Sequence, residues 1–186
     1  MTTVCLQRQF VLSSVTIKRL TESLEEYVRG TGASVDILLI GGLALQAYGY
    51  SDRVTVDMDG EMAGDPEPLV IFLRARQIPA DLGEDLSRWS VIAMPPGYRE
   101  RTSVLLEQPG LRLRLLHPID FVIAKLRRGT DLDLQDAAYV MRRFDLSIQA
   151  VEEAAASAIA ASPKDTTLFL FRTIVQAFCG RRGENP

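Results

Sequence analysis

Residues 37–59 read ILLIGGLALQAYGYSDRVTVDMD. This segment places an apolar strand (residues 37–40) before Gly41, Gly42 and a short helix, and then a second strand that carries Asp57 and Asp59. Because glycine has no side chain, the backbone can approach a phosphate closely, and the free amides at the start of the following helix can donate hydrogen bonds to it. This order of features indicates a site for a metal-bound nucleotide.

The two aspartates are the second half of this pattern. They belong to a stretch with strand character around residues 54–56, and the period of two in a strand points both carboxylates to one face. Mg²⁺ requires oxygen ligands at about 2.1 Å and usually takes one or two protein carboxylates, with water and substrate phosphate as its remaining ligands. The sequence therefore predicts that Asp57 and Asp59 bind Mg²⁺.

Further motifs extend this pattern along the chain. Residues 41–44 (GGLA), Gly49 and residues 53–59 (RVTVDMD) follow the order Gly-Gly-x-Ala, Gly, Arg-x-Thr-x-Asp-x-Asp. Residues 120–126 (DFVIAKL) and 133–136 (DLQD) supply a later Asp and Lys-Leu block and an Asp-x-x-Asp block. Together these motifs, over roughly residues 35–145, resemble the nucleotidyltransferase superfamily, and more closely the small bacterial nucleotidyltransferase-like proteins of minimal type.

The resemblance implies an α/β (α+β) fold, with a small mixed sheet flanked by helices and a C-terminal helical pair. We expect a nucleotidyltransferase-like domain over residues 1–145, a helical extension packed on it over residues 146–180, and a disordered tail over residues 181–186. The implied reaction is the magnesium-dependent transfer of a nucleoside monophosphate from a nucleoside triphosphate to an acceptor hydroxyl, with one or two Mg²⁺ ions. The acceptor stays open among protein, RNA and small molecules.

The matched motifs also imply which residues bind the nucleotide. These are Gly41, Gly42, Arg53, Thr55 and Lys125. The glycines and the amides that follow them would hold the phosphates, and Arg53 and Thr55 would support the strand or contact the phosphates. Lys125 has two interpretations: a contact to the phosphates or to a carboxylate of the site, or a lysine that extends along an apolar surface.

A third acidic residue is harder to find in the sequence. Active members of the superfamily supply one from a later strand, commonly as general base for the acceptor hydroxyl. The later strand at residues 111–116 instead shows Arg112 and Arg114 on one face. The nearest substitute is Glu107 on the preceding strand, either as the third catalytic carboxylate or as a solvated residue beside the hairpin turn, with Glu100 as a weaker candidate. Without such a residue, the alternative is a catalytically silent nucleotidyltransferase-like binding protein, for example one component of a toxin–antitoxin pair.

Three other candidate residues have structural interpretations. Asp133 and Asp136 have the spacing of a helix cap and the third helical position, which favours capping over metal binding. His117 stands alone before Pro118, with no serine or cysteine motif beside it, so we expect a structural role.

A calcium-binding loop that starts at Asp57 would need glycine at its sixth position, where Met62 stands. A Rossmann fingerprint fails because the third glycine is absent.

Composition and length limit the alternatives further. The chain has 186 residues, 47% of them hydrophobic, with 21 basic and 24 acidic residues and a net charge of -3, so no overall basic field attracts nucleic acid. Cys5 and Cys179 lack metal-ligand spacing and are expected to be ordinary thiols. With no apolar run near the ~20 residues of a membrane span and no leader pattern, we expect a cytoplasmic protein. Its partner would be a nucleoside triphosphate, with a homodimer or an antitoxin partner left open.

The other elements are predicted from periodicity and turn residues. They are a strand or arm at residues 1–12, helices at 15–28, from 66 to about 77, at 118–128 and from 148, a strand at 89–94, a hairpin of residues 102–106 and 111–116, and a final helix that Ser162 and Pro163 begin and that runs to residue 178.

Overall fold

The computed structural model describes residues 14–50 and 54–183, with side chains described to residue 180. The strand or arm predicted at residues 1–12 therefore lies outside the described residues, as do Cys5 and Arg53. In the described segments, no helix is long and apolar enough to cross a membrane.

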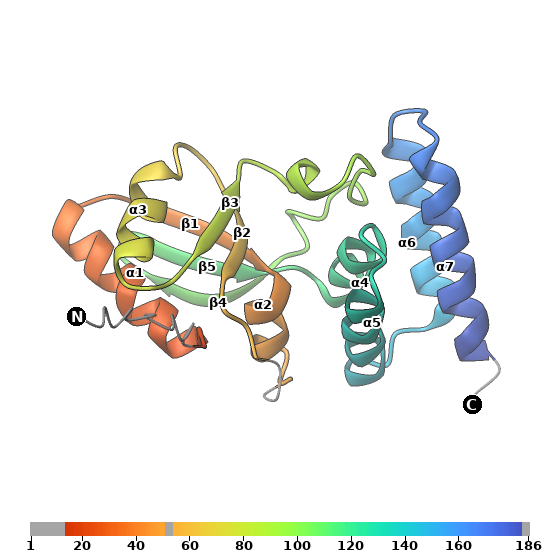
Figure 1. Ribbon diagram of the computed structural model, residues 1–186, viewed down its shortest axis with the longest axis horizontal. Helices are drawn as coiled ribbons and strands as arrows, with labels where there is room; N and C mark the ends of the chain where they lie inside the picture. Colours follow the sequence, from red (N-terminus) through yellow and green to blue (C-terminus); the bar gives the residue numbers. More distant parts are fainter. Residues whose placement is uncertain (1–13, 51–53, 184–186) are drawn as a thin grey trace, which may run out of the picture.

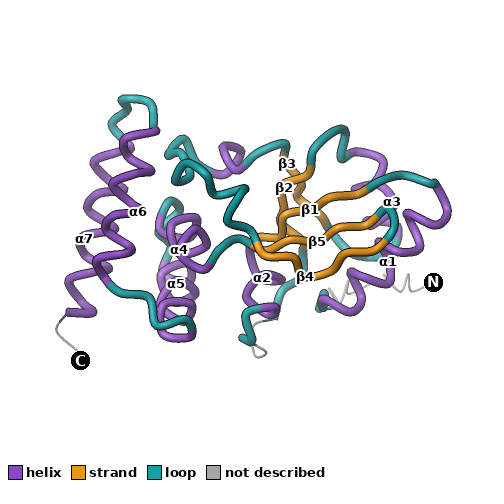
Figure 2. The backbone as a smooth tube through the Cα atoms, turned by 180° about the vertical axis from the view of Figure 1, so that it is seen from behind, coloured by secondary structure: helices purple, strands orange, loops and turns teal. Residues whose placement is uncertain are grey.

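A five-stranded mixed sheet, ordered β3-β2-β1-β5-β4, forms one half of the molecule (Figure 2). Its strands are β1 (Val35–Ile40), β2 (Met58–Met62), β3 (Ala80–Gly83), β4 (Ser103–Gln108) and β5 (Leu111–Leu115). β1 is the central strand, parallel to β5 and antiparallel to β2, and β2 is parallel to β3. Side chains on both faces of β1 are buried, which explains its continuous apolar sequence. The predicted mixed α/β sheet is confirmed.

Three helices accompany the sheet: α1 (Ile17–Thr31), α2 (Gly41–Ala47) and α3 (Glu67–Ala75). α1 and α3 lie side by side at one end of the sheet half (Figure 1), where the rings of Tyr27 and Phe72 meet edge to face at 5.0 Å. α1 ends at Gly32, whose φ of 69° allows its amide to donate back to the carbonyl of Val28. The helix predicted at residues 15–28 is thus present, over residues 17–31.

Four helices form the other half of the molecule (Figure 1): α4 (Pro118–Leu126), α5 (Asp131–Arg143), α6 (Ile148–Ala161) and α7 (Thr167–Gly183). α4 packs on α5 and α6, and α6 pairs with α7. The predicted C-terminal helical pair is present. α4 packs on this pair as well and joins it to α5, which makes up the rest of the helical half.

The start and the end of α7 differ from the prediction. Ser162 is the C-cap of α6, not the start of α7. The first turn of α7 is instead preceded by Asp165, whose Oδ1 accepts a hydrogen bond from the amide of Thr167 at 2.8 Å. The helix continues through Gly183, so the predicted tail is helical over residues 181–183.

Two strand predictions are wrong in position. Residues 54–57 lie outside any strand, and β2 begins only at Met58, so the chain enters the sheet later than its β-branched residues suggest. Residues 89–94 form no strand; the chain instead forms β3 earlier and then a short 3-10 helix, Leu86–Trp89. By contrast, the predicted hairpin is confirmed as β4 and β5, joined by a turn in which Gly110 has a φ of 76°.

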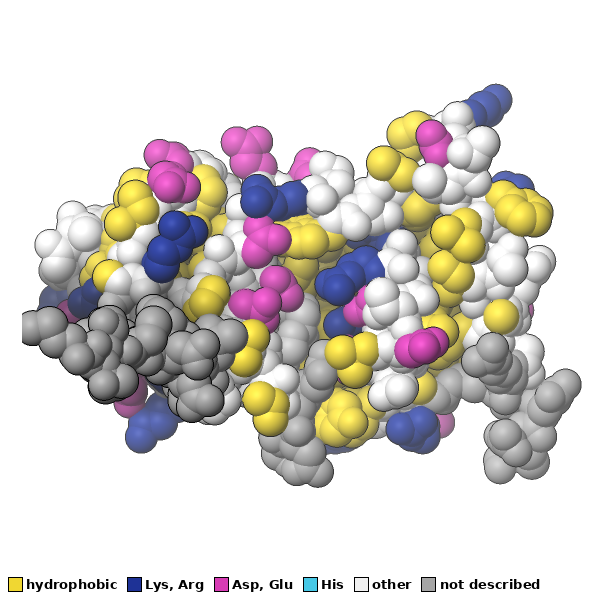
Figure 3. Space-filling model, viewed as in Figure 1, with side chains coloured by type: hydrophobic (Ala, Val, Ile, Leu, Met, Phe, Trp, Pro, Cys, Tyr) yellow, Lys and Arg dark blue, Asp and Glu magenta, His cyan; other side chains and the backbone are white. Residues whose placement is uncertain are grey.

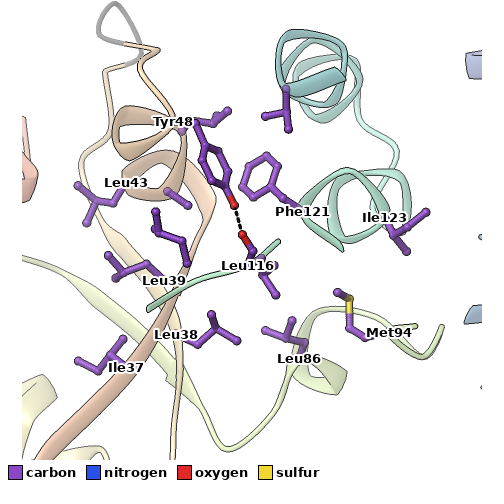
Figure 4. Close-up of a cluster of buried hydrophobic side chains, with 14 of the residues drawn as sticks. Ile37, Leu38, Leu39, Leu43, Tyr48, Leu86, Met94, Leu116, Phe121 and Ile123 are labelled. Carbon is purple, nitrogen blue, oxygen red and sulfur yellow. Dashed lines mark hydrogen bonds between the residues drawn. The ribbon is translucent and has the colours of Figure 1, made fainter. Parts of the chain in front are cut away.

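A buried cluster joins the two halves (Figure 4). Leu39 of β1, Leu43 and Tyr48 of α2, and Phe121 of α4 are all buried. The Tyr48 hydroxyl donates to the carbonyl oxygen of Leu116 at 2.6 Å, and its ring meets that of Phe121 edge to face at 5.2 Å. This packing holds α4 at a fixed place beside the ends of β1 and β2, where the candidate site lies.

Candidate active site

A cleft opens where the end of the sheet faces α4. Ten residues line it: Ile40, Gly41 and Asp59 from the sheet half, Leu86 and Trp89 from the 3-10 helix, and Phe121, Ala124, Lys125, Arg127 and Arg128 from the α4 side. The cleft and its open mouth together span about 410 Å³, which includes open solvent. In Figure 3, acidic side chains of the sheet half and basic side chains of the helical half face each other across this hollow.

Gly41 positions the first carboxylate of the site. Ile40 and Asp59 are register partners on β1 and β2, so the Asp59 side chain reaches the first residue of α2. Gly41 has a φ of 67°, and a Cβ built on it would lie 2.2 Å from Asp59 Oδ2. The absent side chain thus makes room for a carboxylate of the protein itself, in addition to allowing the left-handed backbone.

Gly42 makes room for Thr55 in the same way. A Cβ on Gly42 would lie 2.6 Å from the Thr55 Oγ1 atom. Thr55 is buried, and its hydroxyl donates to Asp57 Oδ1 at 3.1 Å. The glycine pair and Thr55 therefore place the two aspartates next to each other, although Asp57 precedes the strand instead of lying in it.

The two carboxylates interact electrostatically. Burial, the negative charge of Asp57 and that of Asp81 raise the pKa of Asp59 to about 6, against the opposing effects of Arg128 and Lys125. The site thus gathers more negative charge around Asp59 than its basic neighbours offset. Hard carboxylate oxygens with surplus negative charge fit a divalent cation such as Mg²⁺.

Asp81 is the acidic residue that sequence reasoning missed. β3 runs parallel to β2, and Asp59 and Asp81 are register partners, so both side chains emerge on the same face of the sheet. Asp81 is held by Arg88, whose Nε lies 2.9 Å from Oδ1, and by Trp89, whose Nε1 donates to Oδ2 at 3.0 Å. The signal in the sequence is a single acidic residue between Ala80 and Leu82. A strand of four residues shows too little alternation of polar and apolar residues to be recognised from the sequence, so the face on which Asp81 lies could not be predicted.

The structure does not bring Glu107 to the site. Glu107 pairs with Arg112 across the hairpin, and Arg112 pairs with Asp36 at the start of β1, whereas Asp59 pairs with Ile40 at its end. Asp36 and Ile40 are separated by about 13 Å along the strand. Glu107 is also exposed and on the edge strand. Its assignment as the third carboxylate is therefore corrected. Glu100, the weaker candidate, is exposed in a turn and is not among the charges that act on Asp59.

Lys125 lines the cleft but is engaged by two aspartates. Its Nζ lies 3.1 Å from Asp133 Oδ1 and 2.8 Å from Asp136 Oδ2, and all three residues are buried. The N-cap of α5 is Thr130, whose hydroxyl oxygen accepts from the amide of Asp133 at 3.2 Å. The capping roles predicted for the two aspartates are therefore wrong, because both serve a buried ion-pair network between α4 and α5.

The remaining predicted residues have simpler positions. His117 is the N-cap of α4, and its Nδ1 accepts from the amide of Ile119 at 3.3 Å. Cys179 is a buried thiol. Among the described residues, no group of three or more His, Cys, Asp or Glu side chains stands ready to hold a metal ion. Asp57 and Asp59 remain the pair with the chemistry for Mg²⁺, and substrate phosphate would have to complete the shell.

The fold and this cleft define a class of protein. A buried strand, a glycine pair, a short helix and an acidic strand next to the cleft are the features of the nucleotidyltransferase superfamily that the sequence resembles. The family described as "Nucleotidyltransferase of unknown function (DUF6036)" matches residues 15–172, and the chain belongs to this family. No curated protein and no solved structure matches the chain.

Proposed function

We propose that this protein transfers a nucleoside monophosphate from a nucleoside triphosphate to an acceptor hydroxyl in a magnesium-dependent reaction. The observation that carries this proposal is a pair of interacting carboxylates: Asp59 lines the cleft against Gly41, and Asp57, held by Thr55, lies close enough to raise the pKa of Asp59. The facing wall of Lys125, Arg127 and Arg128 offers positive charge for a polyphosphate. A cleft with both features suits a metal-bound triphosphate.

In this reaction the acceptor oxygen forms a bond to the α-phosphorus, and the bond from that phosphorus to the bridging oxygen of the β-phosphate breaks. Mg²⁺ bound by Asp57 and Asp59 would neutralise the charge of the triphosphate and of the departing pyrophosphate. Thr55 and Gly41 keep the two carboxylates in place. Asp81, fixed by its neighbours, is our candidate to orient the acceptor hydroxyl and accept its proton.

The direct test is transfer of label from nucleoside triphosphates that carry ³²P at the α position. Each of the four would be incubated with the protein and Mg²⁺, with the protein itself, bulk RNA and a protein extract as acceptors. We expect labelling that disappears in Asp57→Ala and persists in Glu107→Gln, the matched acidic control outside the cleft. Undiminished transfer by Asp57→Ala would exclude this assignment.

A second function, a nucleotidyltransferase-like protein that binds nucleotide without catalysis, has its own supporting observation. Asp81, the candidate for the general base, is engaged by Arg88 and Trp89, so it must exchange a partner before it can serve in catalysis. Such a protein could act as a toxin–antitoxin component or as a homodimer. Thermal shift with each nucleoside triphosphate, with and without Mg²⁺, separates the two: metal-dependent stabilisation favours the enzyme, and metal-independent or absent stabilisation favours the silent protein.

A further inference from the structure

The basic residues of the cleft differ in how their charges are balanced. Lys125 contacts Asp133 and Asp136, and Arg128 Nε lies 3.3 Å from Asp133 Oδ2. Arg127, the third, has no carboxylate oxygen within 4.0 Å in the part of the chain that the structure describes. Among the three cleft cations, Arg127 is thus the one without a carboxylate in contact in the described residues, and the negative charge of Asp85 acts on it only at longer range.

The surroundings of Arg127 make this lack of a contacting carboxylate unusual. Its Nη2 donates to the carbonyl oxygens of Leu86 and Ser90, at 2.9 and 3.1 Å, and both acceptors are neutral. Its Nε is buried and has no hydrogen-bond partner among the described residues. Burial lowers the pKa of Arg127 to about 10, the direction expected of a desolvated cation. Tyr98 and Asp85 oppose this effect, but burial outweighs them. Desolvating a cation that has no carboxylate in contact costs free energy, and groups with strongly perturbed pKa values cluster at functional sites.

We infer that Arg127 is the anion-binding residue of the cleft and that it binds the polyphosphate of the nucleotide. This inference rests on the proposed function for the identity of the anion. Guanidinium binds phosphate oxygens through several N–H groups at once, and a ligand that lies against Arg127 spans the same cleft that Asp59 lines. The phosphates therefore occupy the space between Arg127 and the acidic pair, while Lys125 keeps its structural partners.

Trp89 provides a reporter for this binding. It is the single tryptophan of the chain and lines the cleft. The two carbonyls that Arg127 holds belong to Leu86 and Ser90, which flank Trp89 in the same turn. An anion on Arg127 changes the electric field and the packing around the indole, so its fluorescence should respond.

The test titrates inorganic tripolyphosphate into the metal-free protein in EDTA, followed by Trp89 fluorescence and by thermal shift. We expect the wild type to bind, and Arg127→Gln to bind at least about tenfold more weakly. Arg112→Gln is the matched control, since it removes the same charge from an exposed position on β5. It should stay within about twofold of the wild type, the effect expected of a remote, screened charge.

Two results would overturn the inference. One is that tripolyphosphate does not bind to the wild type. The other is that Arg127→Gln and Arg112→Gln bind tripolyphosphate with equal affinity, whether both keep the affinity of the wild type or both lose it. Should Arg127→Gln fail to fold, Arg127→Lys replaces it, because lysine keeps the charge but lacks the planar guanidinium that binds phosphate through several N–H groups. Arg127→Lys should bind tripolyphosphate at least about threefold more weakly than the wild type at an unchanged melting temperature. Unchanged affinity of this variant would overturn the inference.

The inference and the proposed function can fail separately. Tripolyphosphate binding through Arg127 without any nucleotide transfer would refute the function and leave the anion site standing. Transfer that depends on Asp57, with an unchanged KM for the nucleotide in Arg127→Gln, would refute the anion site and leave the function standing.

Discussion

Replacing Asp59 by asparagine should stabilise the metal-free protein at neutral pH. The pKa of Asp59 is raised from its ordinary value of 3.8 to about 6, so the folded protein holds this proton more tightly than the unfolded chain does. Ionisation therefore costs stability as pH rises from about 4 to about 6, and the full cost is present above that range. Asparagine keeps the shape of the side chain and removes the charge.

The size of this effect follows from the change in pKa. Each pKa unit corresponds to about 1.4 kcal/mol, which sets an upper limit of about 3 kcal/mol for the shift of Asp59. Because Asp59 is only half-buried, we expect a gain of about 1–3 kcal/mol, which is about 3–10 °C in Tm for a chain of this size. At pH 4.5 the gain should shrink to about a third of its value at pH 7.5.

The assay is urea unfolding of wild type and Asp59→Asn in EDTA, from pH 4.5 to 8. Asp133→Asn serves as the control with the opposite sign, since it removes one partner of the buried Lys125 and should destabilise at pH 7.5. With Mg²⁺ added, the wild type should gain stability and Asp59→Asn should gain none. A destabilised Asp59→Asn, or a difference that does not change with pH, would refute the reasoning.

Three further outcomes are expected. Lys125→Met leaves two buried aspartates without their lysine and should lower the free energy of unfolding by about 3–5 kcal/mol in urea titrations, so an unaltered midpoint would contradict the network. Gly41→Ala should lower the free energy of unfolding by at least about 1 kcal/mol and weaken Mg²⁺ binding in calorimetry, because the new Cβ would lie 2.2 Å from Asp59 Oδ2. Gly30→Ala is the control, since a Cβ there meets open space and should cost no stability. Equal effects of the two substitutions would argue against the close approach of Gly41 and Asp59. Glu107→Gln should change stability by less than about 0.5 kcal/mol and leave any nucleotide transfer intact, and a large loss of transfer would return Glu107 to the site.

Local signals in the sequence predicted the elements that carry the glycine pair. The continuous apolar run of β1, the glycines at the start of α2, and the Pro109 and Gly110 turn between β4 and β5 each act over a few neighbouring residues. Such features need no distant contact to operate. The order of strand, glycines, helix and acidic strand could therefore be predicted with its family resemblance.

The site residues show where local signals end. Asp57 and Asp59 could be named from the motif, but Asp81 could not, because only the parallel pairing of β2 and β3 brings it beside Asp59. Its position in the sequence favours Glu107 as a third carboxylate, but the register of β4, β5 and β1 places Glu107 toward the other end of the sheet. Register depends on long-range strand pairing, which no local window contains.

By itself the sequence determined the class of fold, the glycine pair and the acidic pair, because turn chemistry and hydrophobic periodicity act between near neighbours. Only the tertiary structure decided which charges meet. It paired Lys125 of α4 with Asp133 and Asp136 of α5, and it left Arg127 facing the cleft with no carboxylate in contact among the described residues. Electrostatic balance depends on burial and on distances between separate elements, and these exist only once the chain has folded.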